Sequence, residues 1–226
     1  MAAFFTDLLD SFAEPVFLEK VRIKFHFGEA QAADLRAVAE EMLPLMRQEA
    51  FWERRESRVP EQQGGKKGIY GKEGVYEEVV MSLGSGVDAL QESYGRREML
   101  SESYMLETLA NELLMQGYAA YNRYLAEHAD WHVAGYHFPG SGEGFPLEML
   151  PGLLEGYGPR ITCNAAFCIS PKKSVAFVAE LTQDEKIRCA GICAGCSQIR
   201  CPNRMAGDLE IRIERINKKC CYFWKR

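Results

Sequence analysis

The stretch of sequence that decides the fold reads Ile161-Thr-Cys-Asn-Ala-Ala-Phe-Cys-Ile169, Ser170-Pro-Lys-Lys173 and Ser174-Val-Ala-Phe-Val-Ala-Glu-Leu181. Its middle part combines proline with polar residues, which is typical of a turn, and its two flanks read as strands. The second flank places four apolar side chains on one face: Val175, Phe177, Ala179 and Leu181. The stretch therefore predicts a β-hairpin and, with it, antiparallel pairing.

Further strands are predicted on both sides of this stretch. Residues 21–27, 75–83 and 131–138 have the apolar content and alternation of strands. Residues 209–214 alternate as a strand with one wet face.

Helices are predicted between these strands, from apolar residues at helical spacing. The first covers residues 4–17 and is stopped by Pro15, and the second starts near Glu29 and is ended or kinked by Pro44. The longest covers residues 99–127, and a short one covers 147–154. Strands separated by helices, with at least one hairpin among them, indicate an α+β fold with a mainly antiparallel sheet and flanking helices.

Two carboxylates, Glu107 and Glu112, lie beside the apolar stripe of the longest helix. A carboxylate that flanks a core stripe is usually solvated at its rim, and the alternative is a buried, functional role.

Three connecting segments have the composition of loops. Residues 52–74 are charged and rich in glycine, which predicts a surface connection. Residues 82–86 hold two glycines between a strand and a helix, so they form either a phosphate cradle or a plain turn; the third glycine and the lysine of phosphate-binding loops are absent. Residues 139–146 hold three glycines bracketed by prolines, and their amides can approach a ligand closely.

The composition is that of an ordinary soluble globular chain. Its 226 residues are 47% hydrophobic and 26% charged, and a net charge of −5 argues against a nucleic-acid or anionic-membrane partner. Acidic residues interrupt the apolar N-terminus, so we expect no signal peptide, and no apolar run is long enough for a membrane span. Most of the eight cysteines cluster near the C-terminus, which predicts a reduced, cytoplasmic protein.

Four cysteines within thirteen residues form the most specific motif: Cys189, Cys193, Cys196 and Cys201. The small residues between the first three allow a tight bend, and converging thiolates suit a soft metal. Pro202 follows the last cysteine, as in ferredoxin-type runs, so the spacing favours an iron–sulfur cluster. The alternatives are a zinc site and, without metal, reduced thiols or a local disulfide. We therefore divide the chain into an α+β body at residues 1–182 and a cysteine-rich extension at 183–226.

Several short motifs occur in an order that is familiar from one family. They are Val79-Val-Met-Ser-Leu-Gly84, Glu107-Thr-Leu-Ala-Asn-Glu112, Pro139-Gly140 with Phe145-Pro146-Leu-Glu148, Pro171-Lys-Lys-Ser174-Val175 and Cys193-x2-Cys196-x4-Cys201-x2-Arg204. In this order, over roughly 120 of the 226 residues, the chain resembles the activation domain of vitamin B12-dependent methionine synthase. It looks closest to the stand-alone form that carries a C-terminal cysteine-rich extension.

The resemblance implies a helmet-like α+β domain that binds S-adenosylmethionine next to a corrinoid held by a partner. That partner is a corrinoid-binding protein or the methionine synthase core. The implied function is that of an accessory protein for reductive activation, in which one electron and one methyl group restore methylcobalamin. The reactive chemistry belongs to the cofactors, and the domain binds and orients them.

The resemblance also implies site residues. Glu107 stands where the family places a carboxylate near the methyl donor, and Phe138, Pro139 and Gly140 stand in the family's donor-binding loop. That loop carries an arginine for the donor's carboxylate in the family, and this chain has none there. His137 lies one residue beyond the arginine's position and is either a substitute or a structural histidine.

The predicted cluster would supply the electron for activation without a flavodoxin. Cys189 lies outside the family's three-cysteine pattern, so the fourth ligand is either Cys189 or one of Cys220 and Cys221. Two other functions remain open: a corrinoid reductase that binds no methyl donor, and a non-enzymatic binding module with a structural four-cysteine zinc site.

Overall fold

A computed structural model describes residues 3–56, 75–140, 145–184, 186 and 192. Four antiparallel strands form the central sheet in the order β1-β2-β6-β3. Their bounds are β1 (Phe51–Glu56), β2 (Val75–Ser82), β6 (Ser174–Thr182) and β3 (His132–His137). This arrangement confirms the predicted α+β fold with a mainly antiparallel sheet and flanking helices.

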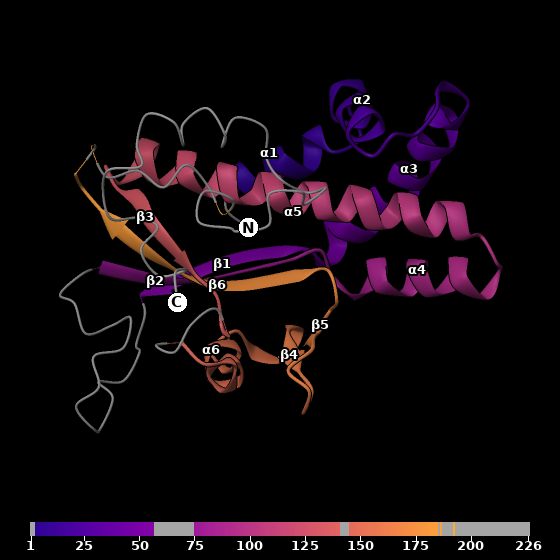
Figure 1. The fold of residues 1–226 in the computed structure, drawn as a ribbon. Coiled ribbons are helices and arrows are strands. Elements are labelled where there is room, and N and C mark those ends of the chain that lie inside the picture. Colours follow the sequence, from indigo (N-terminus) through magenta and orange to yellow (C-terminus); the bar gives the residue numbers. More distant parts are fainter. Residues whose placement is uncertain (1–2, 57–74, 141–144, 185, 187–191, 193–226) are drawn as a thin grey trace, which may run out of the picture.

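The two faces of the sheet are covered differently (Figure 1). One side carries five helices: α1 (Ala3–Ser11), α2 (Pro15–Lys24), α3 (Ala32–Glu49), α4 (Ser85–Arg96) and α5 (Leu100–His128). The other side carries α6 (Leu150–Glu155) and the short pair β4 (Thr162–Cys163) and β5 (Ile169–Ser170). Short 3-10 turns occur at η1 (Glu29–Gln31), η2 (Leu147–Met149) and η3 (Gly158–Arg160). We call the two sides the helix face and the α6 face.

The predicted hairpin around Pro171 is wrong, although its second strand is right. β6 pairs with β2 on one side and with β3 on the other, whereas β5 pairs only with β4 among the described strands. The physical reason is that β6 is apolar on both faces: Phe177 and Ala179 enter the helix-face core, and Ala176 and Val178 enter the α6-face core. A strand buried on both faces belongs in the middle of a sheet.

The predicted surface connection at residues 52–74 begins too early. Residues up to Glu56 belong to β1, in which Trp52 is buried. The two arginines of β1 are paired across the sheet, Arg54 with Glu77 and Arg55 with Glu78 of β2. The remaining residues, 57–74, lie outside the described part of the chain.

The predicted strand at residues 21–27 is wrong. Pro15 does not stop a helix there but begins α2 at its first position, where a missing N–H is tolerated. Residues Phe17, Leu18 and Val21 face the core at helical spacing, whereas Ile23 is 60% exposed. Alternation over so few residues cannot distinguish a strand from a short amphipathic helix.

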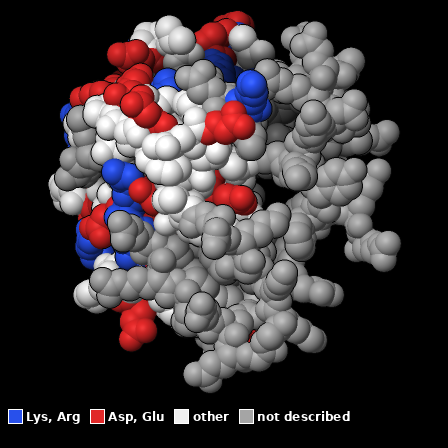
Figure 2. Space-filling view, turned by 90° about the vertical axis from the view of Figure 1, so that its left-hand side faces the viewer, with Lys and Arg blue, Asp and Glu red and all other residues white. Residues whose placement is uncertain are grey.

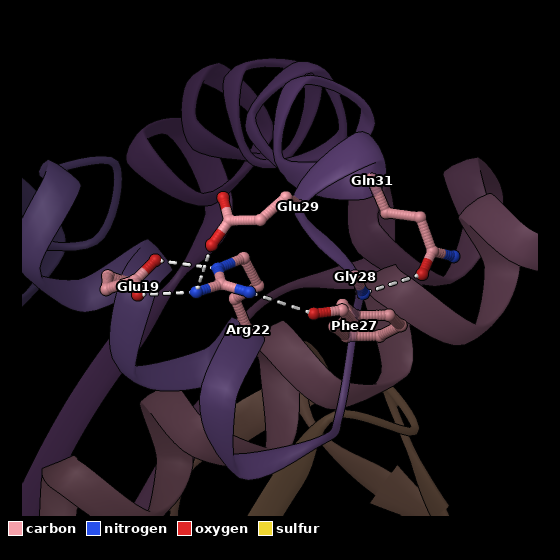
Figure 3. Close-up of polar contacts among 6 residues, drawn as sticks. All are labelled: Glu19, Arg22, Phe27, Gly28, Glu29 and Gln31. Carbon is pink, nitrogen blue, oxygen red and sulfur yellow. Dashed lines mark hydrogen bonds and ion pairs between the residues drawn. The ribbon is translucent and has the colours of Figure 1, made fainter.

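Arg22 holds the end of α2 against the start of the next helical segment (Figure 3). Its guanidinium binds both carboxylate oxygens of Glu19 at 2.7 Å and donates to the carbonyl of Phe27 at 3.1 Å. It also pairs with Glu29 at 2.9 Å. From this turn α3 runs on through Pro44 to Glu49, so that proline does not end the helix.

The predicted long helix is confirmed as α5, which crosses the helix face of the sheet (Figure 1). Glu112, expected at its solvated rim, is instead 2% exposed. Lys20 and Lys24 of α2 reach its two carboxylate oxygens at 2.7 and 2.6 Å. Burial alone would raise the pKa of Glu112, but these two ammonium groups lower it below its usual value. The ion triad fixes α2 onto α5.

Candidate functional site

Glu107 lies at the centre of a polar cluster that joins three elements of the fold. Its carboxylate forms an ion pair with Lys173 at the start of β6, and Lys173 is buried. Gln91 of α4 donates to Glu107 Oε2 at 3.0 Å, and Asn111 of α5 donates to Oε1 at 3.1 Å. Burial alone would raise the pKa of Glu107, but the hydrogen bonds from Lys173 and Gln91 outweigh it and lower the pKa. Glu107 is therefore an ionised, firmly held acceptor.

The turn that carries Lys173 is itself fixed to α4. The Lys172 amide donates to Asp88 Oδ2 at 2.7 Å, and the Lys173 carbonyl accepts from the Leu83 amide at 2.9 Å. The Ser174 hydroxyl donates to that of Ser82 at 2.8 Å. These bonds hold the ammonium of Lys173 at the Glu107 carboxylate, although the two residues are 66 positions apart.

The predicted donor-binding loop begins directly after β3. The ring of Phe138 packs edge-on against Tyr118 at 6.2 Å and tilted against Phe177 at 5.9 Å, both between ring centroids. Gly140 has φ +83°, a conformation that favours glycine, and its amide donates to the Phe145 carbonyl at 2.8 Å. Pro139 and Gly140 thus form a tight turn, and residues 141–144 lie outside the described part.

Glu107 and this loop lie at two separate places along α5. Tyr118, which contacts Phe138, follows Glu107 by eleven residues, so roughly 16 Å of helix lies between them. Eleven residues are just over three whole turns, so both side chains leave the same side of α5. Within the described residues, the structure brings Glu107 together with Lys173 rather than with Phe138, Pro139 or Gly140.

His137, the possible substitute for the family's arginine, pairs with Glu180. Its Nε2 atom lies 3.1 Å from Glu180 Oε2, across neighbouring strands β3 and β6. An imidazole in contact with a carboxylate is already matched in charge when protonated. It therefore binds a ligand's carboxylate less strongly than a guanidinium would.

The four predicted metal ligands, Cys189, Cys193, Cys196 and Cys201, lie outside the described residues, as do Cys220 and Cys221. Ile192, inside the same run, is described, and it packs against the core of the helix face. Among the described residues, Cys163 is half-buried and Cys168 exposed, both as free thiols. In that part of the chain, no group of three or more His, Cys, Asp or Glu side chains could hold a metal ion.

The glycine turn before α4 holds a carboxylate from the protein itself. Glu49, the last residue of α3, accepts from the Ser85 hydroxyl at 2.7 Å and from the Gly86 amide at 2.8 Å. These hydrogen bonds lower its pKa, the one from Ser85 most strongly. Gly84 has φ +90°, and a Cβ there would lie 2.5 Å from that of Glu49. The sequence left open whether this turn binds a phosphate. In the structure, the carboxylate of Glu49 takes the hydrogen bonds that a phosphate would need.

Sequence reasoning missed Lys173, Asp88 and Glu49 as partners in these polar clusters. Lys173 stood in a quoted motif, but nothing in the sequence linked it to Glu107. Glu49 gave one signal, a carboxylate at the end of a helix, which does not name its partner.

Surface charge on one side of the molecule is shown in Figure 2. Acidic side chains there frame a patch of uncharged surface, and basic side chains appear in small separate groups. Among the described helices, none combines the length and the apolar character that crossing a membrane requires.

No protein-family model matches this chain, and no curated protein matches it.

Proposed function

We propose that the protein is an accessory factor for the reductive activation of a cobalamin-dependent methionine synthase or a related corrinoid protein. It delivers an electron from an iron–sulfur cluster bound by Cys189, Cys193, Cys196 and Cys201 to a corrinoid on its partner. It binds S-adenosylmethionine through Glu107 and the loop at Phe138, Pro139 and Gly140. The chain's finer fold is that of a methionine synthase activation domain.

The observation that carries this proposal is the run of four thiols within thirteen residues, closed by Pro202. Thiolates are the ligands that iron–sulfur clusters take, and such a cluster supplies single electrons at low potential. Packing of Ile192 against the helix-face core supports the proposal, because it ties the cysteine run to the α+β body. Electron transfer to a docked partner needs such a tie.

The polar cluster at Glu107 supports the second part. The ionised carboxylate can accept hydrogen bonds from an ammonium or from ribose hydroxyls. Its side chain is 38% exposed, so a ligand can reach it. Glu107 and Tyr118 extend from one side of α5, and Phe138 packs against Tyr118, so a long ligand lying along that helix would contact both Glu107 and Phe138.

The test of the metal site is purification without air, followed by analysis of iron, acid-labile sulfide and zinc. The expected protein is brown, with iron and sulfide in equal amounts. Cys193→Ser loses this cluster, whereas the matched control Cys168→Ser, an exposed thiol outside the run, keeps it. One zinc per chain without iron would instead identify the structural zinc module.

A corrinoid reductase without a methyl donor is the second candidate, and four contacts favour it. His137 is paired with Glu180, and Lys173, Gln91 and Asn111 already engage Glu107. Calorimetric titration with S-adenosylmethionine separates the candidates. Binding that weakens in Glu107→Gln but not in the exposed control Glu127→Gln supports methyl-donor binding. Absence of binding to a cluster-loaded protein that reduces cob(II)alamin supports the reductase.

A further inference from the structure

A groove of about 480 Å³ lies at the end of the sheet at which β5 leads into β6. Figure 1 shows this end of the sheet. The strand register explains its position, because Phe51 pairs with Ser82 and Ser82 with Ser174. The junctions α3–β1, β2–α4 and β5–β6 therefore meet at this end. The described residues that line this groove do not include Glu107, Phe138, Pro139 or Gly140.

One wall of the groove presents the carboxylate of Glu49. The Ser85 hydroxyl and the Gly86 amide hold this group in place and keep its pKa low, so it is an anion at neutral pH. A carboxylate has about four acceptor positions, so the two hydrogen bonds leave capacity for a cation. The wall thus offers a fixed negative charge.

A second wall of the groove presents the guanidinium of Arg160. It lies over the ring of Phe51, with 4.3 Å between Arg160 Cζ and the ring centroid, and its Nη2 pairs with Glu53. A guanidinium has five N–H donors in a rigid plane, and a single carboxylate uses only some of them. Stacking on Phe51 fixes the plane, and the side chain remains half exposed. The wall offers a fixed positive charge.

We infer that this groove binds the zwitterionic head of an α-amino acid with an uncharged side chain. The ligand's ammonium lies at Glu49 and its carboxylate at Arg160. The groove's volume falls in the range of small-molecule sites. Thr162 and Ser170 line it beside Pro159 and Pro171, a mixed set of polar and apolar residues that accepts a neutral side chain.

Phosphorylated ligands fit this groove poorly. Glu49 occupies the N-terminus of α4, which would otherwise attract a phosphate. The two negative charges of Glu49 and Glu53 exceed the one positive charge of Arg160, so a dianion would be repelled. A ligand with one charge of each sign matches the two walls.

The experiment is an NMR titration of the full chain with L-leucine, N-acetyl-leucine and leucinamide, followed at the amides of Ser85, Gly86 and Thr162. Leucine is expected to shift these signals with a dissociation constant of about 1 mM or below. Each capped derivative lacks one of the two charges and is expected to bind at least about tenfold more weakly. If leucine, serine and methionine all leave these amides unchanged at tenfold higher concentration, the inference is wrong.

Substitutions at the two walls give an independent arm. Glu49→Gln, which keeps the shape and an acceptor oxygen, and Arg160→Gln each weaken leucine binding by at least about tenfold. The control Arg47→Gln removes an equal charge from an exposed pair with Asp10 outside the groove and leaves binding unchanged. Unaltered leucine binding in folded Glu49→Gln would overturn the inference, even if Arg160→Gln does not fold. This arm is independent of the metal content.

Discussion

The two faces of the sheet are stabilised in different ways. Among the described residues, the helix-face core contains 33 buried apolar side chains and the α6-face core contains ten. On the smaller face, Arg55 adds three polar contacts to the apolar core. It pairs with Glu78, donates to the Leu153 carbonyl at 2.9 Å, and its Cζ lies 4.5 Å from the ring centroid of Tyr157. The larger face depends on apolar burial, and the smaller one depends also on the guanidinium of Arg55.

The comparison teaches where this chain can tolerate functional residues. A large core stabilises the helix face well enough to hold the buried Glu112 triad and the Glu107 cluster. The α6 face has few buried apolar side chains. Its groove lies at the end of the sheet, where helices and strands are joined. Four comparisons test this contrast.

The largest effect is expected from Phe177→Ala on the helix face. Phe177 is fully buried and contacts four aromatic rings, with Tyr118 nearest at 5.1 Å between centroids. The free energy of unfolding should fall by about 4–5 kcal/mol, the upper part of the range for such truncations. Phe145→Ala on the α6 face should cost only about 3 kcal/mol, since its smaller cluster can collapse around the cavity. Urea denaturation measures both; equal losses would contradict the contrast.

The second effect concerns the buried triad. Lys24→Met removes one ammonium from the buried carboxylate of Glu112, and the Lys24 side chain is only 18% exposed. The free energy of unfolding should fall by about 2 kcal/mol. Lys20→Met removes a 52% exposed ammonium from the same carboxylate and should cost less than about 1 kcal/mol. Unfolding curves of the two variants provide the comparison. A larger loss in Lys20→Met would show that burial does not decide the strength of these pairs.

The third effect concerns the guanidinium of the α6 face. A Cβ at Gly156 would lie 1.0 Å from Arg55 Nη1, so Gly156→Ala must displace Arg55 from Glu78 and Tyr157. The expected loss is about 1–2 kcal/mol, measured by thermal unfolding. Gly152→Ala in α6 meets no atom within 4 Å and should instead stabilise by up to about 1 kcal/mol. Destabilisation of equal size at both glycines would mean that Arg55 has no special role.

The smallest effect is a dependence of stability on pH that arises from three carboxylates. Glu49, Glu107 and Glu112 have pKa values below the usual 4.5, so each stabilises the fold above that pH. This stability is lost as the pH falls from 4.5 through the lowered values, because the folded state must take up protons that the unfolded state already holds. The midpoint temperature of thermal unfolding should therefore decrease as the pH is lowered below 4.5. Glu112→Gln should flatten this fall, whereas an unchanged slope would exclude the triad as its source.

Part of this structure could be predicted from the sequence, because some segments carry their own pattern. The apolar stripe of α5 and the apolar run of β6 have patterns long enough to identify their type. The segment at residues 21–27 does not, and its helix follows from contacts that form only in the fold, such as those of Lys20 and Lys24 with Glu112. Local pattern also could not show that β6 pairs with β2 and β3 rather than with its neighbour in sequence.

The candidate site follows the same division. Glu107 could be named from a motif, but its partner Lys173 is 66 residues away, and no spacing rule connects them. Most residues of the groove come from three separate junctions, which only the strand register brings together. The cysteine run is the opposite case, since its ligands are neighbours in sequence and their spacing alone indicates a metal.

The measurement that tests the central claim most directly is the low-temperature electron paramagnetic resonance spectrum of the anaerobically purified, chemically reduced protein. An iron–sulfur cluster on the four cysteines predicts the signal of one unpaired electron per chain, lost in Cys193→Ser and kept in Cys168→Ser. A silent spectrum from folded protein that holds one zinc per chain would contradict electron delivery by this protein.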